Sequence, residues 1–258
     1  MISLKTRFIR EYNRLYTKLL SFFWYIQGTY APSVYMFHSV VDNEGDLYSK
    51  FAITKKSFDI FLKSIMQNGM KSMDEKKMFE AIENPSDYKY HFIVTFDDIY
   101  DSVYTNAYPI LKRYNIPFVI FITPNLIGKV DTHSGNAFIT NEHLNELLQD
   151  PLCILGSHSL EHVPYRKYSK TECLYNLIES KNILEKQYNR NVNIFAFPYG
   201  RRIEVSNLAI KSLKQTNYEC AFSAINGSIA QKWISGKYFL PRILVDDTYV
   251  SNYIKSIK

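Results

Sequence analysis

Two groups of residues in the sequence could together bind a metal ion and move protons. Asp97 and Asp98 follow the apolar run at residues 93–96, and His158 and His162 lie four residues apart in the stretch SHSLEH. On a helical turn, this spacing would place both imidazoles on one side, where they could bind one cation. A carboxylate from the Asp pair would complete a set of two His and one carboxylate, which suits Zn²⁺ or another divalent transition metal and leaves positions open for water and substrate.

Only one carboxylate of the Asp97-Asp98 pair is needed as a metal ligand. The other would then lie beside a water molecule near the cation, where it could act as a general base. The cation would also relieve the repulsion between the neighbouring carboxylates. The alternative is that a buried strand ends at Asp97 and that the acids begin a solvated loop, or cap a helix expected to start near Ser102.

Alternating strands and helices must position these residues. Apolar or β-rich runs predict strands at residues 34–37, 92–96, 118–122, 153–155, 194–197, 220–222 and 238–240, and helical patterns lie between most of them, at residues 57–67, 74–82, 102–114, 141–148, 170–187 and 204–214. This alternation predicts an α/β fold with a parallel sheet covered by helices. About seven strands in one chain favour a closed or nearly closed (β/α) barrel over an open doubly wound sheet, and active sites lie at the carboxyl ends of such strands.

The composition favours a single catalytic domain over residues 31–258. No linker or repeat interrupts the 258 residues, and 21 Tyr and 17 Phe suit a large core and aromatic-lined clefts. Three widely spaced cysteines predict neither a disulfide framework nor a cysteine zinc site, and fit a reducing compartment slightly better than an oxidising one.

The excess positive charge lies mainly at the amino terminus. Of the net charge of +6, about four units (five basic minus one acidic) lie in the first eighteen residues: Lys5, Arg7, Arg10, Arg14 and Lys18 against Glu11. A nucleic-acid partner is therefore disfavoured, because its footprint would be clustered on the folded body. Residues 1–30 predict a basic amphipathic helix, whose apolar face over residues 4–26 either packs on the domain or lies on an anionic membrane surface. A signal peptide is disfavoured, so a cytoplasmic location, or a peripheral one at the inner membrane face, is expected rather than secretion.

Three motifs together resemble those of a known enzyme family. The stretches TFDD at residues 95–98, SHSLEH at 157–162 and FAFPYG at 195–200, in this order, are similar to the first three motifs of the polysaccharide deacetylases, carbohydrate esterase family 4. The similarity extends from YMFHSV at 35–40 to LPRI at 240–243. It implies a distorted (β/α) barrel and the removal of N- or O-acetyl groups from glycans.

The resemblance also implies roles for individual residues. Asp97 would be the catalytic base, and Asp98, His158 and His162 would be the metal ligands. The backbone N–H of Tyr199 would help to stabilise the tetrahedral oxyanion that forms when an acetamide is hydrolysed.

The sequence departs from the family pattern at the general acid. Many members use a His in a late Leu-x-His motif, and this chain has no His after His162. The branch that includes the biofilm poly-N-acetylglucosamine deacetylases has a permuted order, with an early motif that supplies this His, and YMFHSV offers His38. The alternative is that His38 is an ordinary hydrogen-bonded loop residue.

Two further departures lie beside the metal motif. Ile99 stands where a Gly usually follows TFDD, and Ala196 replaces an Arg that often precedes the third motif. Arg242 of LPRI could take the place of that Arg and hold Asp97 ionised. The alternative for Arg242 is a salt bridge at the rim of the barrel.

The sequence therefore predicts a metal-dependent hydrolase, with one divalent ion and Zn²⁺ favoured, that removes acetyl groups from N-acetylated sugars of a polysaccharide or oligosaccharide. The alternative is a glycan-binding or scaffold protein with a degenerate deacetylase site. The presence of Asp97, Asp98, His158 and His162 together favours the enzyme.

Overall fold

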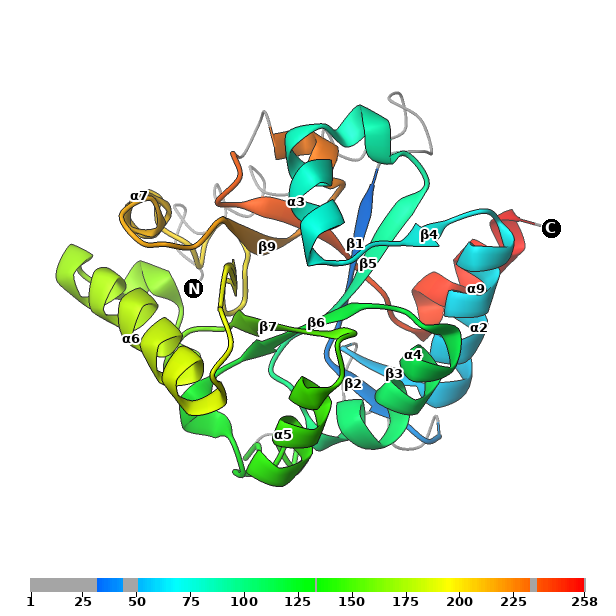
Figure 1. The fold of residues 1–258 in the computed structure, drawn as a ribbon, viewed down its shortest axis with the longest axis horizontal. Helices are drawn as coiled ribbons and strands as arrows, with labels where there is room; N and C mark the ends of the chain where they lie inside the picture. Colours follow the sequence, from blue (N-terminus) through cyan, green and yellow to red (C-terminus); the bar gives the residue numbers. More distant parts are fainter. Residues whose placement is uncertain (1–31, 44–50, 133, 233–235, 258) are drawn as a thin grey trace, which may run out of the picture.

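Seven parallel strands close on themselves to form a barrel (Figure 1). The computed structural model describes residues 32–43, 51–132, 134–232 and 236–257. The barrel strands are β1 (Ser33–Phe37), β5 (His91–Phe96), β6 (Phe118–Ile122), β7 (Cys153–Ser157), β8 (Ile194–Ala196), β9 (Cys220–Asn226) and β10 (Leu240–Leu244). They pair in the order β1-β10-β9-β8-β7-β6-β5, and β5 pairs back to β1. The closed (β/α) barrel predicted from the strand and helix alternation is confirmed.

Three short strands accompany the barrel. Strand β4 (Lys71–Ser72) pairs with the start of β5. Strands β2 (Ser39–Val41) and β3 (Ala52–Thr54) form a separate two-stranded parallel sheet just beyond the end of β1. These strands were not predicted, because runs of two or three residues are too short to show a periodic pattern.

Helices surround the barrel. The α-helices are α2 (Lys55–Gln67), α3 (Glu75–Glu83), α4 (Tyr108–Tyr114), α5 (Asn141–Gln149), α6 (Lys170–Tyr188), α7 (Asn207–Leu213) and α9 (Asp247–Ser256). Short 3₁₀ turns are η2 (Pro85–Tyr88), η4 (Pro124–Leu126), η5 (Tyr165–Lys167) and η6 (Ile229–Gln231), and η3 (Val103–Ala107) is a π-helical turn. Helix α9 packs beside α2, and α7 beside α6 (Figure 1).

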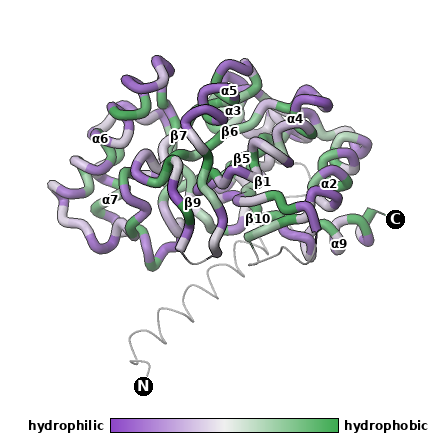
Figure 2. The backbone as a smooth tube through the Cα atoms, turned by 90° about the horizontal axis from the view of Figure 1, so that it is seen from below, coloured by the Kyte–Doolittle hydropathy of each residue, from purple (hydrophilic) through white to green (hydrophobic). Residues whose placement is uncertain are grey.

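Side-chain caps fix where most of these helices begin. The N-cap side chains accept hydrogen bonds from the first turns of their helices at Thr54, Asp74, Thr140, Ser169, Ser206 and Asp246. Ser169 and Glu172 form a complete capping box at the start of α6. Hydropathy alternates along the outer helices, as Figure 2 shows for α2 and α6, and their apolar positions face the barrel.

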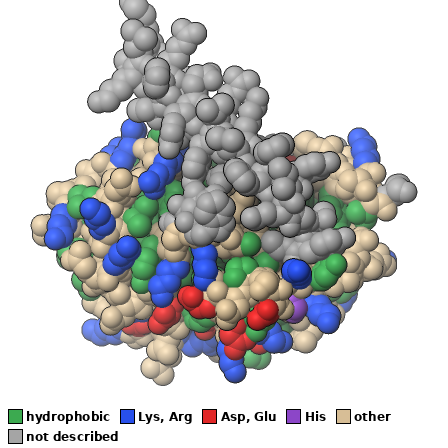
Figure 3. Space-filling view, turned by 90° about the horizontal axis from the view of Figure 1, so that it is seen from above, with side chains coloured by type: hydrophobic (Ala, Val, Ile, Leu, Met, Phe, Trp, Pro, Cys, Tyr) green, Lys and Arg blue, Asp and Glu red, His purple; other side chains and the backbone are tan. Residues whose placement is uncertain are grey.

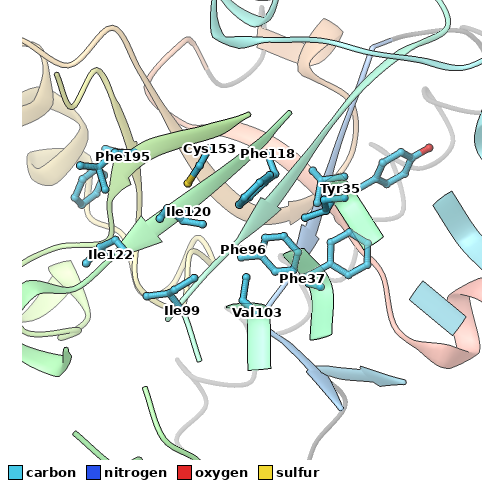
Figure 4. Packing of buried hydrophobic residues seen from close by; sticks show 14 of the residues in the cluster. Tyr35, Phe37, Phe96, Ile99, Val103, Phe118, Ile120, Ile122, Cys153 and Phe195 are labelled. Atoms are coloured by element: carbon cyan, nitrogen blue, oxygen red, sulfur yellow. The ribbon is translucent and has the colours of Figure 1, made fainter. Parts of the chain in front are cut away.

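Alternate residues of the barrel strands contribute to two hydrophobic clusters. One cluster includes Phe92, Phe96 and Phe118 and extends to the surrounding helices (Figure 4). The other includes Ile93, Phe121 and the strand residues whose side chains point to the opposite face of the sheet, together with side chains of α3. Because side chains alternate across a strand, the second cluster lies inside the barrel, and α3 closes its amino-terminal end.

Several strand and helix boundaries differ from the prediction. The last strand was predicted at residues 238–240, but β10 spans Leu240–Leu244. That prediction is wrong because a charged residue in a buried strand is unusual, and Arg242 lies inside β10 with its charge paired. The helix predicted at 102–114 divides into η3 and α4, and the one predicted at 204–214 begins after its cap, Ser206.

The described surface carries charges of both signs. On the face shown in Figure 3, Lys and Arg side chains are scattered around the visible surface, and Asp and Glu side chains lie among them. Within the described ranges, no helix combines the length and apolar character needed to cross a bilayer. The predicted amphipathic helix at residues 4–26 and the domain boundary at 30/31 lie outside the described residues and remain predictions.

Candidate active site and metal centre

The carboxyl ends of the barrel strands bring the predicted site residues together. Two backbone hydrogen bonds continue the strand ladders by one residue: Asp97 N–H donates to the Phe37 carbonyl (2.9 Å), and His158 N–H donates to the Ile122 carbonyl (2.7 Å). His38 follows β1, the Asp pair follows β5, His158 follows β7, and Tyr199 lies three residues past β8. Parallel strands therefore place side chains that are far apart in the sequence at one end of the barrel.

Asp98, His158 and His162 form a compact group with metal-ligand chemistry. One ligand atom from each residue lies within 4.8 Å of the others. The Nε2 atoms of His162 and His158 lie 2.8 Å and 3.4 Å from Asp98 Oδ1. Within the described part of the chain, no other group of three or more His, Cys, Asp or Glu side chains lies close enough together to hold a metal ion.

The hydrogen bonds around this group fit a bound cation. His158 Nδ1 lies 2.9 Å from the Ala196 carbonyl oxygen, which can only accept, so Nδ1 carries a proton and Nε2 is the ring nitrogen that faces Asp98. Asp98 Oδ1 is buried and has no hydrogen bond of acceptable geometry, although His162 Nε2 approaches it. Lone pairs and a carboxylate oxygen that converge in this way repel one another unless a proton or a cation lies between them. Two imidazole nitrogens and one carboxylate oxygen therefore fit a divalent ion such as Zn²⁺.

Electrostatics in the group favour the ionised carboxylate. Burial alone would raise the pKa of Asp98, but the charges and close approach of His162 and His158 hold that pKa well below its ordinary value. Burial lowers the pKa of His162, yet the neighbouring Asp98 carboxylate raises it overall. Asp98 is thus available as an anionic ligand across the physiological pH range.

Asp97 points to a different partner. Its two carboxylate oxygens accept parallel hydrogen bonds of 2.6 Å from Arg242 Nη1 and Nη2, and both side chains are buried. Arg242 also donates to the Ser223 carbonyl through Nε (2.9 Å) and to Thr95 Oγ1 through Nη1 (3.2 Å). Burial would raise the pKa of Asp97, but Arg242 lowers it overall. Arg242 thus pairs with Asp97 inside the barrel. This is the pairing expected if Arg242 takes the place of the family Arg that is Ala196 in this chain.

The loop that carries the two His residues is not helical, so that part of the prediction is wrong. Ser159 and His162 have positive φ angles of 73° and 53°, which a right-handed helix cannot include. Ser159 Oγ instead accepts a hydrogen bond from His162 N–H at 3.0 Å, and the loop turns back on itself. The ring centroids of His158 and His162 lie 5.1 Å apart. The loop brings the imidazoles together by a tight turn rather than by helical spacing.

Backbone strain is concentrated at this end of the barrel. Asp98 (62°), Ile99 (46°) and Tyr199 (60°) also have positive φ angles. Such conformations are unfavourable for residues with a Cβ, above all for the β-branched Ile99, and they cluster at functional sites. At Gly200 (55°), an added Cβ would lie 2.4 Å from the backbone nitrogen of Ala224, so only glycine fits the turn after Tyr199.

His38 lies close to both Asp residues. Burial lowers its pKa, and the charges of Asp97 and Asp98 oppose that effect, which shows that the three side chains share one environment. Its Nδ1 is buried and has no hydrogen-bond partner. The ring centroid of Phe51 lies 4.8 Å from the imidazole. The unpaired Nδ1 differs from the hydrogen-bonded loop residue of the alternative interpretation, and the role of His38 as general acid remains a prediction.

Tyr199 lies at the outer edge of the site. Its side chain is half-exposed, and its ring centroid lies 4.9 Å from that of His162. Three contributors to the site were not predicted: the Ala196 carbonyl, Thr95 and Phe51. Thr95 could have been found, because alternation along β5 places it on the same side of the strand as Asp97. No side-chain signal could identify a backbone carbonyl, and Phe51 depends on the pairing of two very short strands.

Comparison with known proteins supports the resemblance seen in the motifs. A family model described as polysaccharide deacetylase matches residues 86–221, which is more than half of the 258-residue chain. The poly-beta-1,6-N-acetyl-D-glucosamine N-deacetylase of Staphylococcus epidermidis is 25% identical over 213 residues, covering 80% of this chain and 72% of that protein.

Two solved structures share the fold. The Streptococcus pyogenes deacetylase PplD, in complex with acetate, superposes with a TM-score of 0.73 at 22% identity, covering 88% of this chain and 98% of that chain. IcaB from Ammonifex degensii gives a TM-score of 0.72 at 20% identity, covering 88% and 97%. At these identities, the likeness shows a common barrel architecture.

Proposed function

The chain belongs to the polysaccharide deacetylase family, and from this premise we propose that it hydrolyses the acetamide of N-acetylglucosamine units in a polysaccharide or oligosaccharide. The observation that carries the proposal is that a candidate metal-binding group and an ionised carboxylate lie next to each other at one end of the barrel. The Asp98, His158 and His162 group could hold a cation, and the adjacent Asp97 is kept ionised by a buried Arg. In metal-assisted hydrolysis of an amide, a Lewis acid polarises the carbonyl and a base takes a proton from water.

In this proposal, Asp98 and the Nε2 atoms of His158 and His162 would hold one Zn²⁺ ion. A bound zinc ion would supply Lewis acidity, polarising the acetyl carbonyl and lowering the pKa of a nearby water molecule. The Ala196 carbonyl fixes the His158 tautomer that can bind metal, and so acts as a support for the ligand set.

Asp97 is the proposed general base. Its pKa lies below the ordinary value, so it is ionised at neutral pH and can accept a proton from water while the water oxygen bonds to the acetyl carbon. The two bonds from Arg242 occupy one lone pair on each oxygen and leave others free. Arg242 thereby orients the carboxylate without blocking it.

His38 and Tyr199 complete the proposed mechanism. When the C–N bond breaks, the departing amine takes a proton from His38. Burial lowers the pKa of His38 overall, and the charges of Asp97 and Asp98 oppose part of that shift. The backbone N–H of Tyr199 would donate to the carbonyl oxygen as negative charge develops there. Water and amide are thus converted to acetate and a free amine on the sugar.

The substrate class rests on the relatives. The similar Staphylococcus epidermidis protein is named for poly-β-1,6-linked N-acetylglucosamine, and the similar Streptococcus pyogenes deacetylase was solved with acetate, which is the product of this reaction. We therefore propose β-1,6-linked N-acetylglucosamine oligomers as substrates.

Acetate release, measured together with metal content, tests the proposal. The purified full chain is incubated with β-1,6-linked and β-1,4-linked N-acetylglucosamine oligosaccharides and with O-acetylated xylan oligosaccharides. We expect acetate chiefly from the β-1,6-linked N-acetylglucosamine oligomer, loss of activity with a chelator, and recovery when Zn²⁺ is added. Tight binding of the oligosaccharides by metal-loaded protein, without acetate release, would instead identify the glycan-binding protein of the alternative interpretation.

A further inference from the structure

Phe51 is an exposed aromatic residue held beside the candidate general acid. Strands β2 and β3 pair in parallel with Ser39 opposite Ala52, and this register places the preceding residues, His38 and Phe51, side by side. Their ring centroids lie 4.8 Å apart, with the planes at 40°. Phe51 nevertheless keeps 38% of its surface exposed. A large apolar ring beside His38 thus keeps part of its surface in contact with solvent.

Neighbouring elements hold both strands of this small sheet in place. On β3, the Asp247 carboxylate of α9 accepts hydrogen bonds from Thr54 N–H (2.9 Å) and from the Thr54 hydroxyl (2.7 Å). On β2, the side-chain amide of Asn106 donates to the Val40 carbonyl (2.8 Å). Phe51, three residues before Thr54, is therefore presented by a supported strand. Rigid support of this kind reduces the entropy lost when a ligand is bound.

The chemistry of the reaction places a sugar ring next to Phe51. The amine that takes a proton from His38 is attached directly to the pyranose ring of the substrate, so that ring must lie within a few atoms of the imidazole. Phe51 contacts the same imidazole. The apolar C–H face of a pyranose packs favourably on an aromatic face, because both surfaces are removed from water.

We propose that Phe51 is a substrate-binding residue that stacks against the sugar ring carrying the acetamide, an inference that rests on the proposed function. It binds the ring in the ground state and the transition state alike, so its contribution is to substrate affinity. Among the exposed large apolar side chains, Phe51 differs from Ile60 on α2, which is equally exposed at 39% but lies on an outer helix. Ile60 is therefore a matched control.

Three substitutions at Phe51 separate stacking from packing. Phe51→Leu keeps an apolar contact with His38 but removes the aromatic face, Phe51→Trp restores an aromatic face, and Phe51→Ala removes both. For acetate release from a β-1,6-linked N-acetylglucosamine oligosaccharide, we expect KM to rise about five- to tenfold in Leu and Ala variants, with kcat within about twofold. The Trp variant and Ile60→Ala should keep a KM close to that of the parent protein.

A binding measurement separates this inference from the proposed function. The dissociation constant of the same oligosaccharide is measured by calorimetry for Asp97→Asn and for Asp97→Asn with Phe51→Leu, in which no turnover interferes. A five- to tenfold weaker binding in the double variant supports the inference even if the parent protein releases no acetate, an outcome that would overturn only the deacetylase proposal. A fall in kcat with unchanged KM and unchanged binding would show that Phe51 acts only through His38. That result, or no change in any variant, would overturn the inference.

Discussion

The two ends of the barrel both contain clustered polar side chains, but the two clusters differ in whether their polar atoms have hydrogen-bond partners. At the amino end, a cavity of about 530 Å³ is lined by residues that include Glu75, Arg190 and Asn193. Arg190 donates to the carbonyls of Leu148 (2.7 Å) and Cys153 (3.1 Å), and the Asn193 amide donates to Glu75 (3.2 Å). At the carboxyl end, by contrast, buried polar atoms of Asp98 and His38 have no hydrogen-bond partner.

The backbone shows the same contrast. Near the amino ends of β5, β6 and β8, Tyr90, Asn115 and Asn189 adopt positive φ angles, but all three are exposed, and the two Asn residues occupy C-cap positions where Asn is well tolerated. At the carboxyl end, positive φ angles occur at Asp98, Ile99 and His162, which are buried or partly buried. Hydrogen-bonded polar groups and relaxed turns stabilise the fold, whereas unpaired groups and strained turns indicate where a ligand completes the structure.

The largest expected difference between the two ends is in catalysis. Asp97→Asn should lower acetate release on the order of 10⁴-fold, because a proton acceptor is lost, while metal content stays normal. Asp98→Ala should lose the metal as well as activity. Glu75→Gln at the amino end, which keeps a partner for Asn193, should change neither quantity. Metal analysis and acetate assays on the three variants check this, and equal metal loss in Asp97→Asn and Asp98→Ala would contradict the division of roles.

The next largest effect is on stability, and it compares two arginines. Arg242→Met leaves the Asp97 carboxylate buried without its partner, which should lower the free energy of unfolding by about 3–5 kcal/mol. Arg190→Met removes two hydrogen bonds to carbonyls from a partly exposed side chain, which should cost about 1–3 kcal/mol. Urea unfolding measures both.

A second substitution tests the cause of the Arg242 effect. If the cost arises from the unpaired charge, then adding Asp97→Asn to Arg242→Met should recover part of the lost stability. Additive losses in the double variant would mean that Arg242 acts mainly through its packing against Phe121 and Phe222, whose ring centroids lie 5.4 Å and 5.9 Å from the guanidinium carbon.

A smaller catalytic effect is expected at His38. His38→Ala should slow acetate release by about 10²-fold or more, because the departing amine loses its proton donor, and metal content should stay normal. His143, which is hydrogen-bonded to Asp101 at 2.6 Å, provides a control, and His143→Ala should leave turnover unchanged. Full activity in His38→Ala would refute the assignment of the early motif as the source of the acid.

The fold was largely predictable because its signals are local and repeated. All seven predicted strands overlap barrel strands of the structure, the last of them at Leu240 alone, since buried parallel strands form apolar runs that stand out between amphipathic helices. The exceptions have a common cause in tertiary contacts. Strand β10 contains a charged residue whose partner, Asp97, is 145 residues away, and β2 and β3 are stabilised by hydrogen bonds to α9 and η3.

The site was predictable in its members and not in its geometry. Motif order and strand ends brought Asp97, Asp98, His158 and His162 to one edge, because carboxyl ends of parallel strands converge. The tight turn at Ser159 and the pairing of Arg242 with both oxygens of Asp97 depend on contacts that no spacing encodes. The roles assigned to these residues remain predictions that the variants above test.

The smallest expected effect concerns the strain that distinguishes the two ends. Ile99 packs in the hydrophobic cluster near Val103 and Ile122 (Figure 4). Ile99→Gly would relieve a positive φ angle worth about 1–2 kcal/mol but would lose buried side-chain contacts worth about 2–5 kcal/mol, so stability should fall by about 1–3 kcal/mol. Asn115→Gly, at an exposed turn of nearly the same φ angle, removes no buried side chain. Glycine adopts the positive φ angle more readily, but its greater flexibility in the unfolded chain offsets this gain, so the free energy of unfolding should change by less than about 0.5 kcal/mol. Unfolding measurements on both variants check this pair. If Ile99→Gly were more stable than the parent protein, the free energy of backbone strain at Ile99 would exceed the stabilisation from burying its side chain. The strain at the carboxyl end of the barrel would then be larger than the value of about 1–2 kcal/mol expected for one positive φ angle.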